Sequence, residues 1–421
     1  MSSGRTTSAG TSFVLPTSGN PADEPRPSAP CTPKALSLED RFEAWIPSPA
    51  VLLDEGLALA KVISNWAHGR LDAKRDLPQT NDPRRRAELS WHSLQQTMEV
   101  PFREGVFLNG PQEPVLASVW PVSQTLAAAL DLLTLHAGGR KEVDAILQSL
   151  KLYALDGAFG QGVFHGPPPY HRLVDDNLWL ALDFLQAHAL TGEPSLLRKA
   201  EALYPFFNAN RLPSGGLHWG ENEQGPSRNG VSNLPAVEYG VLLFKATGKR
   251  RYLQLAMECD AFVEQHLRSP SGLIFDRQSD KGEIETRFWT CNQGLSIRAD
   301  VMLYGVTHAP LYLKRAQATA HAALAYFGQE DRLWREPAPF NAIFFRNLLA
   351  LDLIAPDPVY KKTLDTYLER AWREARGPTG LFDRGGVGLY SGTEMQLINQ
   401  AAFVQMFALQ CMTPKQLAGL T

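Results

Sequence analysis

Two consecutive aspartates, Asp175 and Asp176, stand where a loop meets a predicted helix. Side chains that diverge from such a junction could hold their carboxyl groups roughly 5–5.5 Å apart, as in the catalytic pair of a retaining glycosidase. Two carboxylates this close disfavour each other's ionisation, which suits one of them to act as an acid at neutral pH. An aspartate before a helix is more often an N-cap. Capping needs only one aspartate and leaves the second unexplained.

Amide, carboxylate and indole side chains occupy similar places in other segments of the chain. Amides and carboxylates bind sugar hydroxyls, and tryptophan offers an apolar face to a sugar ring. We therefore predict that the substrate-binding side chains are Trp120, Trp219, Asn229, Asn233, Asp276, Trp289, Asn292 and Gln293. Trp334, Asn341 and Thr393–Glu394 lie at comparable positions. Their simpler roles would be helix caps and core filling, but their recurrence in different segments favours a shared site.

A sequence period indicates which elements position these side chains. A glycine follows a helical segment at Gly160, Gly216, Gly272, Gly328 and Gly380, at intervals of 56, 56, 56 and 52 residues. A second phrase recurs between them as LTGEPSLLRKA, ATGKRRYLQLA and VTHAPLYLKRA. Self-similarity at a fixed period indicates one supersecondary unit used repeatedly.

Each unit is predicted to be a helical hairpin. SVWPVSQTLAAALDLL and NLPAVEYGVLLF are apolar nearly all round, which is typical of buried helices, whereas the segment 251–267 has one apolar stripe. Inner helices should begin near residues 118, 176, 233, 292, 340 and 394, and outer helices near 51, 139, 194, 249, 309 and 356. A charged insert at 72–88 obscures the first outer helix. Six hairpins predict an all-α (α/α)6 barrel, with an open α-solenoid as the alternative.

The lengths of the connections predict where the site lies. The turns from inner to outer helices are short, whereas the glycine-led loops run about 12 to 20 residues. All long loops should therefore emerge on one rim, at the N-termini of the inner helices. Loops on a rigid scaffold often carry function, and helix N-termini add a positive dipole end.

Composition excludes several classes of function. The net charge is -3, without the basic footprint of a nucleic-acid-binding protein. The four cysteines are widely spaced and the ten histidines form no ligand motif, so we expect no disulfide framework, metal or cofactor. Residues 1–37 are rich in Ser, Thr, Pro and Gly and are predicted to be a disordered tail before one catalytic domain, residues 38–421. With no signal-peptide core or membrane span, we expect a cytoplasmic monomer that does not bind membranes.

Several phrases resemble one family of carbohydrate-active enzymes. HRLVDDNLWLALDFLQAHALTG, GGLHW, SGLIFD, WTCNQGLSIRADVMLYGVT, FNAIFFRNLLAL and INQAAFVQMFAL are similar, in order and spacing, to signatures of glycoside hydrolase family 76. The resemblance covers roughly residues 115–410. It implies an (α/α)6 barrel and retaining hydrolysis of α-1,6-linked mannan or manno-oligosaccharides. It also implies that Asp175 is the nucleophile and Asp176 the acid/base.

Two alternative functions remain open at this point. The same barrel could carry a sugar epimerase or isomerase, for which His218 is the main candidate base. The chain could also be a carbohydrate-binding protein without activity, in which case the aspartate pair would be idle. Release of reducing ends from an oligosaccharide separates a hydrolase from an epimerase, and any turnover excludes the binding protein.

Overall fold

The computed structural model describes residues 78–101, 103–111, 113–163, 172–221, 227–384 and 395–420. The predicted tail at 1–37, the helix expected near residue 51 and the pair Thr393–Glu394 lie outside these residues.

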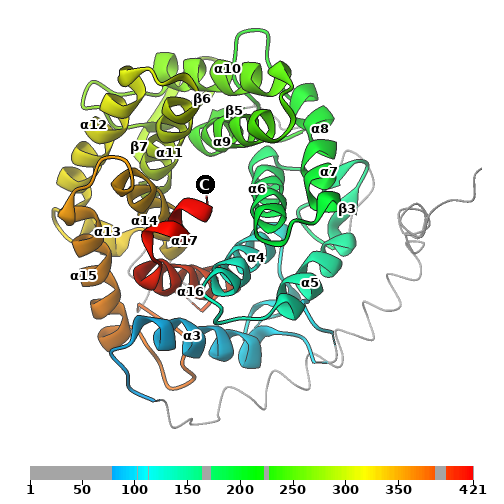
Figure 1. The fold of residues 1–421 in the computed structure, drawn as a ribbon, viewed down its shortest axis with the longest axis vertical. Helices are drawn as coiled ribbons and strands as arrows, with labels where there is room; N and C mark the ends of the chain where they lie inside the picture. Colours follow the sequence, from blue (N-terminus) through cyan, green and yellow to red (C-terminus); the bar gives the residue numbers. More distant parts are fainter. Residues whose placement is uncertain are drawn as a thin grey trace, which may run out of the picture. The chain divides into compact units, whose positions relative to one another are not determined.

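Six long helices form a closed inner ring (Figure 1). They are α4 (Val119–Thr134), α6 (Val174–Thr191), α9 (Gly230–Thr247), α11 (Thr290–Thr307), α14 (Ala338–Asp352) and α16 (Leu397–Cys411). Each contacts the next in this order, and α16 packs against α4 to close the ring. The closure confirms the predicted (α/α)6 barrel and excludes the open solenoid. Every inner helix begins within three residues of its predicted start.

An outer layer of helices surrounds this ring (Figure 1). It consists of α3 (Pro83–Met98), α5 (Arg140–Ser149), α7 (Pro194–Ala202) continued by α8 (Tyr204–Ala209), α10 (Arg250–His266), α12 (Pro310–Phe327) and α15 (Pro358–Glu374). The outer helices bury one face: in α10, for example, Tyr252, Cys259 and Val263 are buried, whereas Met257 is exposed. This division between all-round and one-sided burial agrees with the predicted hydrophobic patterns.

The outer helix that packs against α16 is α3, and it begins inside the segment 72–88. This corrects the prediction that the whole segment is a charged insert. Asp82 is the N-cap of α3 and accepts a hydrogen bond of 3.1 Å from the backbone N–H of Arg84. Pro83 occupies the first helical position, where its missing N–H has no cost. Arg86 is buried because its guanidinium donates to Glu369 of α15 at 2.7 Å. The charged run is therefore the start of a helix.

The recurring phrase between inner and outer helices is a tight turn. Thr191, Thr247 and Thr307 each end an inner helix and donate a hydrogen bond of 2.7 Å to the carbonyl four residues earlier. Each hydroxyl also accepts from the N–H two residues later, at 3.2–3.3 Å. The next residue, such as Gly248, has a positive φ and reverses the chain.

Short helices and strands complete the described part of the chain. They are the 3-10 helix η1 (Leu150–Tyr153), α13 (Arg332–Arg335), α17 (Pro414–Gly419), β1 (Leu108–Gly110), β2 (Glu113–Leu116), β3 (Ala154–Leu155), β4 (Ala158–Phe159), β5 (Ser227–Asn229), β6 (Phe275–Ser279) and β7 (Ile284–Phe288). The antiparallel sheets are β1-β2, β3-β4 and β5-β6-β7. The last sheet joins two glycine-led loops, because Asn229 pairs with Arg277 and Phe275 with Phe288.

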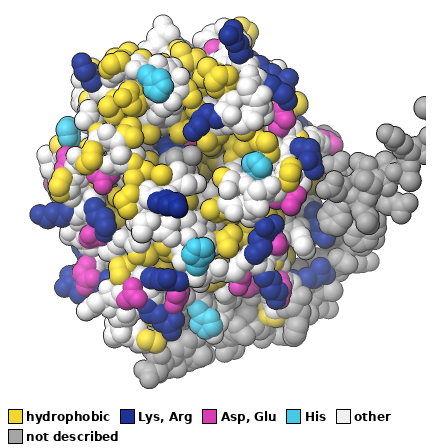
Figure 2. All heavy atoms as spheres, viewed as in Figure 1, with side chains coloured by type: hydrophobic (Ala, Val, Ile, Leu, Met, Phe, Trp, Pro, Cys, Tyr) yellow, Lys and Arg dark blue, Asp and Glu magenta, His cyan; other side chains and the backbone are white. Residues whose placement is uncertain are grey.

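The surface shows no concentration of one charge sign on the face drawn in Figure 2, where basic and acidic side chains are intermixed. None of the helices in the described ranges is long and apolar enough to cross a membrane.

Candidate active site

The aspartate pair lies in the first turn of α6. The N-cap of this helix is Leu173, so neither aspartate has the capping position. Asp175 is partly exposed and Asp176 is buried. The backbone N–H of Asp176 donates to Oδ1 of Asp175 at 3.0 Å. The carboxylate of Asp175 is therefore fixed by the helix that carries it.

Trp219 approaches Asp175 from the next glycine-led loop. Its indole Nε1–H donates to Oδ2 of Asp175 at 2.9 Å. The loop is held by two backbone bonds: the N–H of Val174 donates to the Trp219 carbonyl at 2.7 Å, and the N–H of Trp219 donates to Ser227 at 2.8 Å. Both oxygens of Asp175 thus accept hydrogen bonds, which stabilise its ionised form. Trp219 is half-buried, so its ring retains an accessible face.

The electrostatic environment separates the two aspartates. Burial raises the pKa of Asp176 well above its ordinary value, and the neighbouring charge of Asp175 raises it further. A carboxyl group whose pKa is raised keeps its proton to a higher pH and can donate it to a leaving group. Asp175, with its two hydrogen bonds, is suited to remain an anion. Two carboxyl groups in different environments are a pattern of acid and nucleophile in glycosidases.

A second group of predicted residues gathers around Asp276 on β6. Burial raises the pKa of the Asp276 carboxyl, while a hydrogen bond from Trp289, and to a smaller extent the Asn292 amide, lower it. Asn292 is fully buried and lies against Gly230, where an added Cβ would meet its amide at 2.9 Å. Asn229 is also buried and accepts from the Ser227 hydroxyl at 2.8 Å. Asn292 therefore lies in the group around the half-buried Asp276, and its buried Nδ2 has no hydrogen-bond partner in the structure.

Aromatic rings line up beside this group. Trp120 at the start of α4 and Trp289 before α11 both pack on Phe340 of α14, with ring centroids 6.2 Å and 5.3 Å apart. Arg287 lies over the Trp289 ring at 3.7 Å from its centroid. Phe340 was not among the predicted site residues, although it opens FNAIFFRNLLAL, one of the phrases that resemble the family. The sequence feature that could have identified Phe340 is its position, an aromatic residue at the start of a predicted inner helix.

Asn233 and Gln293 have a different role from the predicted one. The Asn233 amide accepts from the N–H of Leu217 at 2.7 Å and donates to the Leu217 carbonyl at 3.2 Å. Gln293 makes the same pair of bonds with Ile274, at 2.7 and 2.9 Å. Both side chains are fully buried, so the prediction that they contact substrate is not retained.

This arrangement, which we call the amide clamp, recurs around the barrel. Asn177 clamps Phe159 with bonds of 2.8 and 3.0 Å, and Gln400 clamps Phe382 with two bonds of 2.8 Å. In each case an amide in the first turn of an inner helix holds the backbone of a residue that lies just before or just after one of the periodic glycines. The clamps fix the base of the loops that carry the candidate site.

Glu336 is a further acidic group that the sequence did not single out. Its carboxylate accepts from the N–H of Thr290 at 2.9 Å and from the Thr290 hydroxyl at 3.3 Å. It thereby caps α11 from the adjacent loop, although it lies 46 residues away in sequence. Burial raises its pKa to about 7. Since only the folded chain brings Glu336 to this helix end, no local motif marks it.

His218, the candidate base of an epimerase, precedes Trp219. Burial lowers its pKa, and the nearby positive charge of Arg228 lowers it further. The imidazole is therefore neutral at physiological pH. Among the described residues no group of three or more His, Cys, Asp or Glu side chains could hold a metal ion.

Known proteins share both the sequence pattern and the fold. The model of glycosyl hydrolase family 76 matches residues 108–419. An α-mannanase of this family from Bacteroides thetaiotaomicron superposes with a TM-score of 0.71 at 17% identity, covering 78% of this chain and 95% of that one. An inactive variant of an α-1,6-mannanase from Salegentibacter sp., with two consecutive aspartates replaced by asparagine, was solved with α-1,6-mannotriose. It superposes with a TM-score of 0.64 at 18% identity, covering 78% and 99% of the two chains.

The same fold also occurs with another activity. A D-mannose isomerase superposes with a TM-score of 0.62 at 14% identity, covering 82% of this chain and 99% of that one. None of the curated protein sequences matches the chain. The structural likenesses therefore establish only the barrel fold. The assignment to an enzyme class rests on the match to the family model.

Proposed function

Because the chain belongs to glycosyl hydrolase family 76 and is thus a glycoside hydrolase, we propose that it cleaves α-1,6-linked mannan or manno-oligosaccharides with retention of configuration. Asp175 is the nucleophile and Asp176 the acid/base. The observation that carries this proposal is the contrast within the pair: Asp175 accepts two hydrogen bonds, whereas burial raises the pKa of Asp176.

The reaction proceeds in two displacements. Asp175 attacks the anomeric carbon while Asp176 donates its proton to the glycosidic oxygen, so that a glycosyl ester forms and the leaving sugar departs. Asp176, now ionised, takes a proton from water, which attacks the same carbon and releases Asp175. The Trp219 indole holds the nucleophile in position through the bond to Oδ2.

The substrate class is supported by related enzymes and by the residues of the rim. A related α-1,6-mannanase with two consecutive aspartates replaced is inactive and binds α-1,6-mannotriose, and the consecutive aspartates of this chain are Asp175 and Asp176. Trp219 offers a partly exposed ring and Asp276 a half-buried carboxyl for the sugar. Trp120 and Trp289 would extend the aromatic surface.

The proposal is tested with a panel of α-1,6-, α-1,2- and α-1,3-linked manno-oligosaccharides. We expect cleavage of the α-1,6 series and initial products of retained anomeric configuration by NMR. Preferential cleavage of another linkage would contradict the proposed α-1,6 specificity. A product of inverted configuration would contradict the assignment of Asp175 as the nucleophile. Interconversion of free mannose without hydrolysis would instead favour an isomerase with His218 as the base, which the mannose isomerase fold makes the second candidate.

The raised pKa of Asp176 predicts the pH dependence of hydrolysis. Activity requires its proton, so kcat/KM should fall as the pH rises through this raised pKa. The alkaline limb should therefore lie well above 3.8, the ordinary value of an aspartate. The check is a profile of kcat/KM for an α-1,6-mannotriose substrate. With an activated aryl mannoside, Asp176→Ala should show no alkaline limb in its glycosylation step; a limb at the wild-type position would assign the proton to another group.

Trp219→Phe separates positioning from stacking. Phenylalanine keeps an aromatic face and removes the Nε1–H donor to Asp175. Since the indole donor fixes the orientation of the nucleophile, and a misplacement of about 1 Å can cost about 100-fold in rate, we expect kcat to fall by up to about 100-fold with little change in KM. Trp219→Ala should in addition raise KM. Thermal unfolding provides the control, because Trp219 is only half-buried. Unchanged kcat in Trp219→Phe would show that the indole donor is dispensable.

A further inference from the structure

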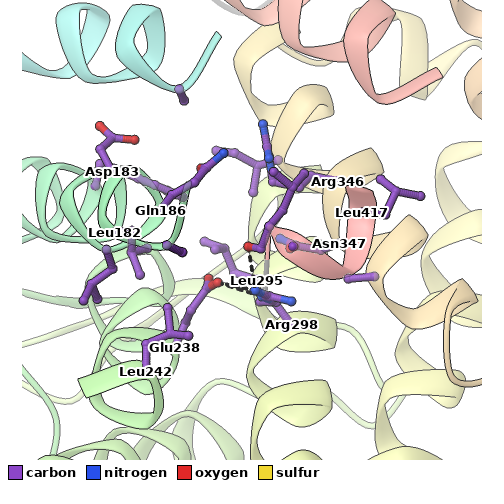
Figure 3. A pocket seen from close by; sticks show the side chains of 18 of the residues that line it. Leu182, Asp183, Gln186, Glu238, Leu242, Leu295, Arg298, Arg346, Asn347 and Leu417 are labelled. Atoms are coloured by element: carbon purple, nitrogen blue, oxygen red, sulfur yellow. Dashed lines mark hydrogen bonds and ion pairs between the residues drawn. The ribbon is translucent and has the colours of Figure 1, made fainter. Parts of the chain in front are cut away.

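A cavity of about 340 Å³ lies inside the inner ring, away from the N-terminal turn that carries the aspartate pair. Its walls are the middle and C-terminal parts of the inner helices, from Gln124 on α4 to Gln405 on α16, together with α17 (Figure 3). Exposed lining residues such as Lys245 and Ala246 mark an opening to solvent at the C-terminal end of α9. The volume is within the range of small-molecule sites.

The two arginines that line this cavity are each paired with a carboxylate. Arg298 donates through Nε to Glu238 at 2.7 Å (Figure 3). Arg346 forms an ion pair with the buried Asp131 and donates to Gln405 at 3.2 Å. Each arginine thus has its own carboxylate. An anionic ligand would find no uncompensated arginine inside the cavity.

Hydrogen-bonding capacity nevertheless remains. Arg298 is 3% exposed, and its Nη1 has no hydrogen-bond partner in the structure. Asp183 is likewise buried in the wall, and burial raises the pKa of its carboxyl well above the ordinary value. A buried guanidinium nitrogen without an acceptor is costly. It therefore indicates an acceptor supplied from the cavity.

The rest of the wall is apolar and includes one aromatic ring. Trp179, one turn beyond the aspartate pair on α6, is half-buried and lines the cavity. Leu242, Leu295 and Leu417 lie on other walls (Figure 3). Leu417 belongs to α17, and the carbonyl of Leu420, directly after this helix, accepts from Nη2 of Arg298 at 3.4 Å. An apolar wall with an aromatic ring, amides and a free donor suits a neutral molecule with both hydroxyls and apolar faces.

We propose that this inner cavity is a second carbohydrate site, which binds a neutral hexose inside the barrel and is entered from the end opposite the catalytic pair. Arg298 and Asp183 hydrogen-bond the hydroxyls, and Trp179 packs on the ring. The proposal does not depend on the hydrolase mechanism, because none of these residues belongs to the aspartate pair.

The experiment measures D-mannose binding to the full chain carrying Asp175→Asn and Asp176→Asn, by ligand-observed NMR titration. Ala246→Trp is added to block the exposed mouth, which requires no repacking of the interior. Ala261→Trp, at an exposed position of α10 outside the cavity lining, is the matched control. Trp179→Leu removes the aromatic face. Inorganic phosphate is titrated in parallel as an anionic probe.

We expect mannose binding to be lost with Ala246→Trp, weakened about 3–10-fold with Trp179→Leu, and unchanged with Ala261→Trp. Binding that persists unchanged in both cavity variants would place the sugar in the catalytic cleft and overturn the proposal. An absence of mannose binding at 100-fold molar excess and above would also overturn it. Phosphate binding that Ala246→Trp abolishes, without mannose binding, would make this an anion site instead.

Discussion

Replacing either aspartate at the start of α6 with asparagine should remove nearly all hydrolysis and leave the barrel folded. Asp176→Asn cannot supply a proton, and general acid catalysis contributes about 10²–10⁴-fold to the rate. Asp175→Asn cannot form the glycosyl ester, so its loss should be at least as large. The measurement is kcat/KM on an α-1,6-linked manno-oligosaccharide. Turnover near the wild-type value in either variant would remove that residue from the mechanism.

The melting temperature provides the control for Asp176→Asn, and the direction in which it should change can be derived. Because the pKa of Asp176 is raised in the folded state, the folded chain keeps a proton that the unfolded chain has already lost. Stability therefore decreases as the pH rises above the unfolded pKa of about 3.9. Asparagine removes this effect, so the variant should melt above the wild type at neutral pH. Below about pH 3.9 the two melting temperatures should converge.

The order of the two roles can be tested with a good leaving group. An aryl mannoside needs little protonation, so Asp176→Ala should retain its first step whereas Asp175→Ala should not. Azide should then accelerate the second step of Asp176→Ala and give a product of retained configuration. Rescue of Asp175→Ala with retention would exchange the roles.

Gln293→Leu should unfold the barrel at a much lower denaturant concentration than the wild type. The substitution leaves the N–H and the carbonyl of Ile274 without the partners they have at 2.7 and 2.9 Å. An unsatisfied buried polar group costs about 1–3 kcal/mol, so the two together predict a loss of about 2–6 kcal/mol in the free energy of unfolding. Denaturant titration measures this loss.

The matched control for the amide clamp is Gln254→Leu on the exposed face of α10, which should change stability by less than about 0.5 kcal/mol. Gln293 touches neither the aspartate pair nor the sugar, so folded Gln293→Leu should lose far less turnover than Asp175→Asn or Asp176→Asn. A stable variant that has lost turnover would return Gln293 to the substrate-binding residues.

Much of the barrel can be predicted because the features that define its helices lie within short stretches of the sequence. The inner helices are apolar all round and follow a period, so their starts can be read within three residues. Asp175 and Asp176 are consecutive, and no folding is needed to bring them together. The start of α3 was obscured by its charged residues, although Asp82 and Pro83 are an ordinary capping signal.

The roles of the amides could not be read from the sequence. Asn233 and Asn292 both lie in the first turn of an inner helix, yet one clamps the backbone of Leu217 and the other lies beside Asp276. The difference depends on which loop packs above each helix. The contacts of Trp219 with Asp175 and of Glu336 with Thr290 cross 44 and 46 residues for the same reason.

Closure of the inner ring by α4 and α16 has a consequence for how the chain acquires its structure during translation. The Gln405 amide donates to the carbonyl of Gln124 at 3.0 Å across this seam, and α3 also packs on α16. At synthesis rates of about 5–20 residues per second, the roughly 260 residues between α4 and α16 take ~13–50 s to produce. For that time the nascent chain presents the apolar seam of α4 uncovered. A ribosome stalled before Leu397 should therefore hold a chaperone-binding, protease-sensitive intermediate.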